Sequence, residues 1–467
     1  MQDLLLLVAT LGFFSAGVLV PFVMSLGYVW VDMFSPHLVS ASILSGLPIS
    51  LTFAVSAIVL YLLRDRKYPP KTSAILWTQL LLCIWITLTS TWAVRPDIAW
   101  ERWDPSIKVA LFATFLPYVI RSRVQIEALA LVYFFSIAAH TVPWGMKTLL
   151  TGGGYNQQLG LLRGNQSLLE DSSVISAVCV MMAPFALVWQ KHSILLPKTK
   201  LIAVGIWSII VLSLVASIGT FARTALVAFA VCGGAMLLRA KRKVLFLCVA
   251  SVLGAVMFAV TSDKWLARIN TVNDYENESS AYVRVLVWRW TLEFSTSHPF
   301  GGGFWAYVVN RIELPGPNGS VSVQYARAWH NIFIGLLGEH GYVGLGLYLF
   351  LVFQIFYAMR VVQRATRASA EHQWCADFAQ TLQICLLTLL ISGNFVEFGW
   401  QPVIWYLFSM AVALREYVRR AIPSSTFAEN LASRGRGIGS DPIAIGPGFG
   451  VNGRPLPGRA ARSATRL

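Results

Sequence analysis

Two histidines and a glutamate stand where a long polar stretch meets an apolar one. His330 opens the run, and Glu339 and His340 follow nine and ten residues later. A neutral imidazole can accept a proton from an attacking hydroxyl group, so His330 is a candidate general base. The alternative is an ordinary hydrogen-bonded histidine at a helix end. A straight helix would separate His330 from Glu339 and His340 by about 14 Å, so the three need not act together.

Glycine recurs at every third position of the same run, at Gly335, Gly338, Gly341 and Gly344. On a helix these residues fall on neighbouring rows, where another backbone or a lipid-linked ligand can approach closely. The simpler alternative is a capped helix start with a glycine packing groove. Residues 342–358 are long enough to span a membrane alone. Residues 331–341 are therefore expected to form either a separate interfacial helix, with a break at Gly341, or part of a tilted long helix.

Two arginines are candidates for binding an anion. Arg223 is the only charge in a short turn between two apolar segments, and Arg284 lies four residues before Trp288, on the same helix face. A guanidinium group binds phosphate oxygens as a fork, so the pair suits a lipid phosphate or pyrophosphate. The alternatives are that Arg223 reaches ordinary lipid headgroups and that Arg284 pairs with Glu276 or Glu278.

Motifs of several other chemistries are absent. The sequence has no P-loop, GxSxG or HExxH motif. No two histidines stand at ligand spacing with an acidic third residue, so neither a metal site nor a cofactor is expected. The six cysteines include no CxxC pair, and none lies in the longest polar loop, which argues against a disulfide framework or a zinc site.

Composition identifies the elements that must position these residues. The chain has 467 residues, of which 56% are hydrophobic and 13% charged, whereas soluble domains carry about 25% charged residues. Apolar runs near 20 residues recur throughout. The predicted fold is all-α, a polytopic membrane protein of about 12 or 13 transmembrane helices. The spans are expected near residues 4–31 (as one helix or two), 42–63, 74–93, 107–120, 125–146, 172–190, 200–219, 223–238, 243–261, 331–359, 377–393 and 400–414.

Charge divides the loops into two alternating sets. Basic residues gather near residues 64–71, 121–123, 191–200, 239–243, 360–367 and after Arg415. The longer, mixed loops are 94–106, 147–171, 220–223, 263–329 and 394–399. The positive-inside rule places the first set in the cytoplasm and the second outside, and it accounts for the net charge of +15 without nucleic-acid binding. The N-terminus is not expected to be a cleavable signal, because no basic region precedes Leu4.

The chain is expected to divide into four parts. These are N-terminal transmembrane helices (1–262), one large outer loop (263–329), C-terminal transmembrane helices (330–420) and a disordered basic cytoplasmic tail (421–467). The loop is expected to form short helices. One of them carries Arg284 and ends before His298-Pro299, and Gly301-Gly302-Gly303 then forms a flexible turn. Pro117 is expected to kink the short span at 107–120.

Three elements resemble those of the O-antigen ligase and polymerase superfamily. His330-Asn331, nine further residues and Gly341-Tyr342-Val343-Gly344 match its H-[NSQ]-x9-G-x-x-G motif, which here also follows the longest outer loop. Arg223 looks like the family's arginine at the outer end of a mid-chain span. Arg284-x-x-x-Trp288, followed by His298-Pro299-Phe300-Gly301-Gly302-Gly303, looks like its loop signature. The three elements occur in the family's order and on the expected side.

The chain also resembles one branch, the putative O-glycosylation ligases associated with the exosortase A system. The matching segments are Asp3–Leu7, Phe34–His37, Ala99–Trp103, Leu150–Tyr155 and Leu337–Leu345. The branch carries a Gly-Asp-Asn-Asn-like start to the span after the second outer loop. This chain has Leu169-Glu170-Asp171-Ser172-Ser173 instead, which leaves the role of Asp171 open.

The resemblance implies a glycosyltransferase of GT-C-like architecture in the bacterial inner membrane. It implies transfer of an oligosaccharide en bloc from undecaprenyl pyrophosphate to an acceptor hydroxyl group at the periplasmic face, without metal or nucleotide sugar. The acceptor would be a protein, lipid or polysaccharide. His330 would be the base, and Arg223 and Arg284 would hold the pyrophosphate. Secondary candidates are Asn331, Trp288, Arg289, Glu339, His340, Gly341 and Gly344.

Three alternatives stay open. A polymerase of the same superfamily would join repeat units on the lipid carrier, and the motifs do not separate it from a ligase. A polysaccharide or lipid transporter would be expected to show internal repeats and charges in the middle of its spans, and neither is seen. Nothing in the sequence argues for a non-catalytic partner of an export system.

Overall fold

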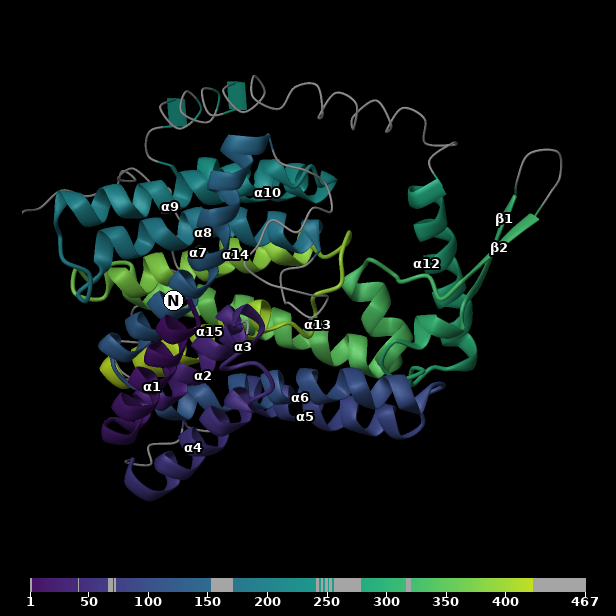
Figure 1. Cartoon of the computed structure of the whole chain (residues 1–467), viewed down its shortest axis with the longest axis horizontal. Coiled ribbons are helices and arrows are strands. Elements are labelled where there is room, and N and C mark those ends of the chain that lie inside the picture. The colour runs from purple at the N-terminus through teal and green to yellow at the C-terminus, as the bar shows by residue number, and fades with distance from the viewer. Residues whose placement is uncertain are drawn as a thin grey trace, which may run out of the picture.

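The computed structural model describes residues 2–40, 42–65, 73–152, 171–240, 279–315 and 321–422, with isolated positions at 70, 243–244, 247, 251 and 254–255. This part of the chain folds into a bundle of α-helices with one two-stranded sheet (Figure 1). Seven of the described helices are long and apolar enough to cross a membrane, and α2 (Pro21–Phe34) and α4 (Ile49–Arg64) are shorter apolar helices. The prediction of an all-α, polytopic membrane protein is confirmed.

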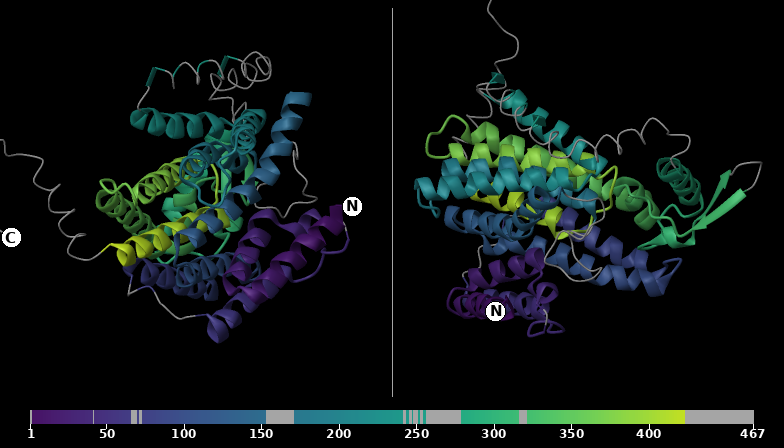
Figure 2. Two further views of the ribbon diagram at one scale, coloured as in Figure 1. Left: turned by 90° about the vertical axis from the view of Figure 1, so that its left-hand side faces the viewer. Right: turned by 45° about the horizontal axis from the view of Figure 1, so that its top comes forward.

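Residues 4–31 form two helices, α1 (Gln2–Leu19) and α2. The break falls at Val20, which is extended, because Pro21 has no amide hydrogen and favours the first position of a new helix. A short helix, α3 (Pro36–Val39), follows α2. Figure 2 shows that α1, α2 and α4 lie together along one side of the bundle, where α2 packs on α7 (Arg123–Thr151).

The first outer loop is shorter than predicted. Between α5 (Ala74–Thr91) and α6 (Pro96–Val119) only a short turn remains, so the assignment of residues 94–106 to a loop is wrong. Pro96 starts α6, and the helix continues through Pro105 and Pro117 over 24 residues. The N-terminal half of α6 carries several charged residues, among them Arg102. Because this half is not apolar, the pattern of apolar runs did not predict it as helix. These charged residues lie on a helix that extends the bundle at one end (Figure 1).

Three helices follow α7: α8 (Ser172–His192), α9 (Lys200–Gly219) and α10 (Arg223–Arg239). The Ser217 hydroxyl donates to the Ser176 carbonyl at 3.0 Å, which joins the end of α9 to the start of α8. Asp171 caps α8, its side chain accepting from the Ser173 amide. Arg223, which opens α10 after a short turn, therefore lies at the same end of the bundle as Asp171.

The described part of the large outer loop is not a set of short helices, so that prediction is wrong. It contains one helix of 19 residues, α12 (Ser279–Ser297), a 3-10 turn (Ala306–Val309) and an antiparallel hairpin of β1 (Arg311–Pro315) and β2 (Val321–Tyr325). Figure 1 shows the hairpin projecting beyond the end of the bundle. The alternation of exposed and buried residues in β1 is too short to be recognised in the sequence. The helix ends directly before His298-Pro299, as expected.

The C-terminal part consists of α13 (Ile332–Thr366), α14 (Gln373–Ser392) and α15 (Pro402–Ala421). Gly341 interrupts α13 with φ 66° and ψ −167°, which favours the alternative with a break at this glycine over a continuous tilted helix. The apolar helix α15 is buried on nearly every side because α6, α13 and α14 surround it. The predicted span at 243–261 and the tail beyond residue 422 fall outside the described residues, apart from the isolated positions.

Candidate active site

The turn between α14 and α15 holds the backbone of His330. The His330 amide donates to Glu397 Oε1 at 2.8 Å, and the Ile332 amide donates to the Gly393 carbonyl at 2.7 Å. His330 has φ +47°, in the left-handed region that only a few per cent of non-glycine residues adopt, with asparagine, aspartate and histidine the most frequent among them. Strained backbone of this kind persists where the surroundings over-determine it, often at functional sites.

The tryptophan before His330 anchors the same segment to α12. Trp329 is fully buried and donates from Nε1 to Thr291 Oγ1 at 2.7 Å. In return, Trp288 Nε1 donates to the Trp329 carbonyl at 2.8 Å. Trp288 was predicted to share a face of α12 with Arg284, and the structure gives it a positioning role next to His330.

Asn331 caps the N-terminus of α13. Its side-chain oxygen accepts from the amides of Phe333 at 2.9 Å and Ile334 at 3.2 Å. Such a cap is typically worth about 1 kcal/mol. Asn331 therefore fixes where α13 begins, directly after His330.

The surroundings of His330 favour its neutral form. Burial lowers the pKa of His330 below its usual value, the positive charges of Arg284 and Arg327 lower it further, and Asp171 acts in the opposite direction. Arg284 and Asp171 are thus both within electrostatic reach of the imidazole. A neutral imidazole has a free lone pair at neutral pH and can accept a proton.

The three arginines predicted as site residues, Arg284, Arg289 and Arg223, lie in different surroundings. Arg284 is half-buried on α12 and acts on His330, whereas Arg289 on the same helix forms an exposed pair with Glu293 at 3.1 Å. Arg223 is the first residue of α10, at the same end of the bundle as Asp171. The alternative partners Glu276 and Glu278 lie outside the described residues.

Glu339 is buried at a junction of three segments. Its Oε1 accepts from the Trp305 amide at 3.0 Å, and its Oε2 accepts from Trp400 Nε1 at 3.3 Å. Its backbone carbonyl accepts from the Gly303 amide at 2.8 Å. Glu339 therefore joins α13 to the loop after α12 and to the turn before α15.

His340 is fully buried on the other side of this junction. Its Nδ1 lies 2.7 Å from Thr89 Oγ1, and its carbonyl accepts from Trp85 Nε1 at 2.8 Å. The ring also packs edge-on against Trp400. These contacts give His340 a packing role between α5 and α13, separate from that of His330.

The glycine rows of α13 are filled by the protein itself. A methyl group on Gly338 would meet Trp329 at 2.4 Å, and one on Gly344 would meet the His340 side chain at 2.2 Å. The expectation of an open groove for a lipid-linked ligand is therefore not met. The Gly301–Gly303 turn is not a loose connection either, because the Gly302 amide donates to the Gly338 carbonyl at 2.9 Å.

We expect Gly341→Ala to destabilise the protein by on the order of 3 kcal/mol. The backbone of Gly341 has a conformation reserved for glycine, and an added Cβ would lie 2.2 Å from the Pro299 carbonyl oxygen. Gly346→Ala is the matched control, because nothing lies within 4 Å of its Cβ position on the same helix. The apparent Tm of both variants in detergent tests this, and equal values would contradict it.

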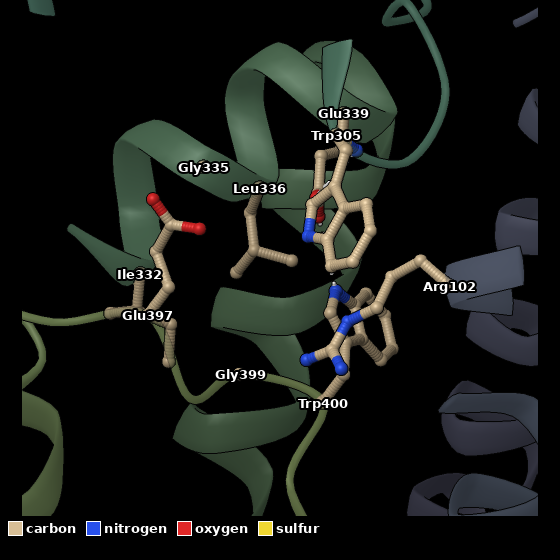
Figure 3. A pocket seen from close by; sticks show the side chains of 9 residues that line it. All are labelled: Arg102, Trp305, Ile332, Gly335, Leu336, Glu339, Glu397, Gly399 and Trp400. Carbon is tan, nitrogen blue, oxygen red and sulfur yellow. Dashed lines mark hydrogen bonds between the residues drawn. The ribbon is translucent and has the colours of Figure 1, made fainter. Parts of the chain in front are cut away.

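A small, partly open pocket lies beside the His330 segment (Figure 3). Its volume is about 30 Å³. The polar lining consists of Arg102, Glu339 and Glu397, with Trp305 and Trp400 as the aromatic lining. Figure 3 shows Arg102 entering beside Trp400, with Glu397 on the opposite side near Ile332. Burial raises the pKa of Glu397 to about 7, although the His330 amide and Arg102 act to lower it.

The sequence did not single out Arg102 and Glu397 as site residues. It also did not show that Asp171 lies near His330. Glu397 is the one acidic residue in the short turn 393–401 between two apolar spans, on the predicted outer side. A charge in such a turn is the same signal that singled out Arg223, so it could have been found. Arg102 lies in the segment Ala99–Trp103, which carries the family resemblance. No local sequence pattern connects this part of α6 with residue 339.

Two family models match the chain, in separate segments. Residues 1–194 match a family of unknown function, DUF5935, and residues 208–349 match the O-antigen ligase family. No curated protein matches the chain. The O-antigen ligase segment contains Arg223, Arg284 and His330, and Arg102 lies in the other matched segment.

The helical bundle and the matched segment define a multi-pass membrane protein of the glycan ligase or polymerase type. The match over residues 208–349 supports the O-antigen ligase superfamily for this segment of the chain.

Proposed function

We propose that this protein is a glycan ligase that transfers an oligosaccharide en bloc from undecaprenyl pyrophosphate to the hydroxyl group of a protein, lipid or polysaccharide acceptor. The observation that carries the proposal is the placement of His330. Its neutral imidazole is held in a strained, well-anchored turn, within reach of the charge of Arg284, inside the O-antigen ligase segment.

The acceptor oxygen attacks the anomeric carbon of the first sugar while His330 takes the proton of the hydroxyl group. The new carbon–oxygen bond forms as the bond from that carbon to the pyrophosphate oxygen breaks. The electron pair leaves with the lipid pyrophosphate. The products are the glycosylated acceptor and undecaprenyl pyrophosphate, so one base and charge compensation for the leaving group suffice.

Arg223 and Arg284 supply that compensation in this proposal. Arg223 stands at the first position of α10, where the helix dipole disfavours a cation and favours an anion. A bound pyrophosphate would gain both the guanidinium fork and the helix N-terminus. Arg284 acts on the same region as His330, where negative charge develops as the leaving group departs.

The sidedness of the site belongs to the proposal. Basic loops lie at the end of the bundle opposite to His330, so the positive-inside rule supports an inner-membrane protein whose site faces the periplasm. Branch-level resemblance supports protein O-glycosylation as the acceptor chemistry.

Deleting the gene tests the reaction. A ligase predicts long glycan left on the lipid carrier and loss of glycan from secreted proteins, measured by mass spectrometry of both fractions. Single unpolymerised units on the carrier would instead support a polymerase. Unchanged lipid-linked glycan and unchanged glycoproteins would contradict both.

Arg327→Gln is expected to move the acid limb of the pH profile of kcat/KM to higher pH. A general base must be deprotonated to act, and the lowered pKa of His330 extends activity below the usual histidine range. Removing the positive charge of Arg327 raises the pKa of His330, so activity is lost at a higher pH on acidification. The opposing charge of Asp171 and the remaining charge of Arg284 stay in place.

The control for this profile is Arg311→Gln. Arg311 is an exposed arginine of the same loop region that pairs with Glu313 on β1 at 3.1 Å. Its acid limb should match that of the wild type. An acid limb of Arg327→Gln that does not move would argue against His330 as the titrating base.

A further inference from the structure

The pocket of Arg102, Glu339 and Glu397 has a composition unlike that of a phosphate site. Two carboxylates line it against one guanidinium group. Carboxylates repel the oxygens of a pyrophosphate, whereas they accept hydrogen bonds from hydroxyl groups. A guanidinium group beside them donates to a hydroxyl oxygen. Arg102 and Glu397 on opposite sides of one pocket therefore suit a neutral, hydroxyl-bearing group (Figure 3).

Two tryptophans complete this composition. Arg102 Cζ lies 5.7 Å from the centroid of the Trp305 ring, and Trp400 lines the pocket on the side of Arg102 (Figure 3). Flat apolar faces beside a few polar groups are typical of small-molecule sites. Trp305 has φ +55°, so a second strained residue, besides His330, lies at this place.

We propose that this pocket is a saccharide subsite, in which Arg102, Glu339 and Glu397 bind a hydroxyl or hydroxymethyl group of a neutral sugar. The proposal rests on the proposed glycan transfer and adds the residues that bind the sugar. A volume of about 30 Å³ admits one or two water-sized groups and no sugar ring. The ring therefore stays at the mouth of the pocket, against the indoles.

The subsite is coupled directly to the candidate base. Glu397 Oε1 accepts from the His330 amide at 2.8 Å, so the carboxylate that binds the sugar hydroxyl also holds the turn that carries His330. A sugar bound here would lie next to the imidazole. The sugar could belong to the acceptor or to the first residue of the donor glycan, since both present neutral hydroxyl groups.

The subsite also gives a role to the N-terminal segment. Arg102 comes from α6, within residues 1–194, whose family has no known function. Thr89 and Trp85 of α5, in the same segment, hold His340 next to Glu339. This segment thus builds one wall of the sugar subsite, and the O-antigen ligase segment supplies Glu339 and Trp305.

Saturation-transfer NMR on the full chain in nanodiscs tests the subsite, with methyl glycosides of glucose, galactose and N-acetylglucosamine as probes. At least one glycoside should give a signal in the wild type, and Arg102→Gln should lower that signal at least about tenfold, because a buried polar contact is lost. Arg95→Gln, at the N-cap position of the same helix and in an exposed pair with Asp97 at 2.8 Å, should leave the signal unchanged. The double variant Glu339→Gln/Glu397→Gln should behave like Arg102→Gln.

Absence of a signal in the wild type, equal signals in the wild type and Arg102→Gln, or displacement by inorganic pyrophosphate would overturn the subsite. Size-exclusion elution and apparent Tm confirm that each variant is folded. Preloading with undecaprenyl-pyrophosphate-linked glycan separates the two sources: a lost signal assigns the subsite to the donor sugar, and a retained signal assigns it to the acceptor.

Failure of the proposed function has a different signature. If the wild type binds glycosides in an Arg102-dependent manner but transfers no glycan, the subsite stands and the ligase proposal fails. If transfer proceeds and glycoside binding does not depend on Arg102, the ligase proposal stands and the subsite fails.

Discussion

His330→Ala and His330→Asn are both expected to lower glycan transfer by at least about 100-fold, the usual contribution of a general base. Neither side chain accepts the acceptor's proton as imidazole does. Asparagine adopts the left-handed backbone more readily than alanine, so His330→Asn removes the base with the least disturbance of the turn. Transfer from lipid-linked glycan to acceptor, measured with purified protein in nanodiscs, checks the result.

His372→Ala is the control for both variants. His372 lies in the turn between α13 and α14, at the opposite end of α13, and its replacement should leave transfer unchanged. Binding of the lipid-linked donor should survive in His330→Asn, because the arginines are untouched. Wild-type rates of glycan attachment in His330→Asn would rule out the proposed mechanism.

Arg223→Ala and Arg284→Ala are each expected to lower transfer by about 100- to 1000-fold, as for loss of a preorganised group that stabilises developing charge. Lysine at either position should recover only part of the rate, since it keeps the charge but loses the planar fork. Donor KM and kcat, measured separately, show which state each arginine stabilises.

Each arginine has a matched control on its own helix. Arg239 ends α10 where Arg223 begins it, and Arg289 faces outward on α12 in its pair with Glu293. Arg239→Ala and Arg289→Ala should retain wild-type transfer. If Arg289→Ala loses as much activity as Arg284→Ala, the effect comes from net charge rather than from the position of one guanidinium group.

Helix positions followed from the sequence wherever apolar content alone decides them. The predicted spans at 200–219 and 223–238 coincide closely with α9 and α10. The length of the apolar run after Gly341 left a break at this glycine and a tilted long helix as alternatives, and the structure has the break. Apolar content did not predict the polar half of α6 at residues 96–106 or the short strands β1 and β2. In both places tertiary packing rather than local composition stabilises the element.

The sequence singled out His330, Arg284 and Trp288, and the structure brings these residues together. The sequence alone could not show that Glu339 and His340 are buried, because their partners Trp400 and Thr89 lie far away in the chain. Arg102 was missed for the same reason, whereas Glu397 carried a local signal as the one acidic residue of the short turn 393–401. Contacts between distant segments leave no periodic trace in a single sequence.

The separate origin of Arg102 and Glu339 constrains how this protein can diverge. Loss of Arg102 from α6 would leave the buried carboxyl groups of Glu339 and Glu397 without the one guanidinium group that lines their pocket. Positions 102, 339 and 397 are therefore expected to covary among homologues. A chimaera that takes its first two hundred residues from a relative should transfer glycan only when the relative's residue at position 102 is compatible with Glu339 and Glu397 of this chain.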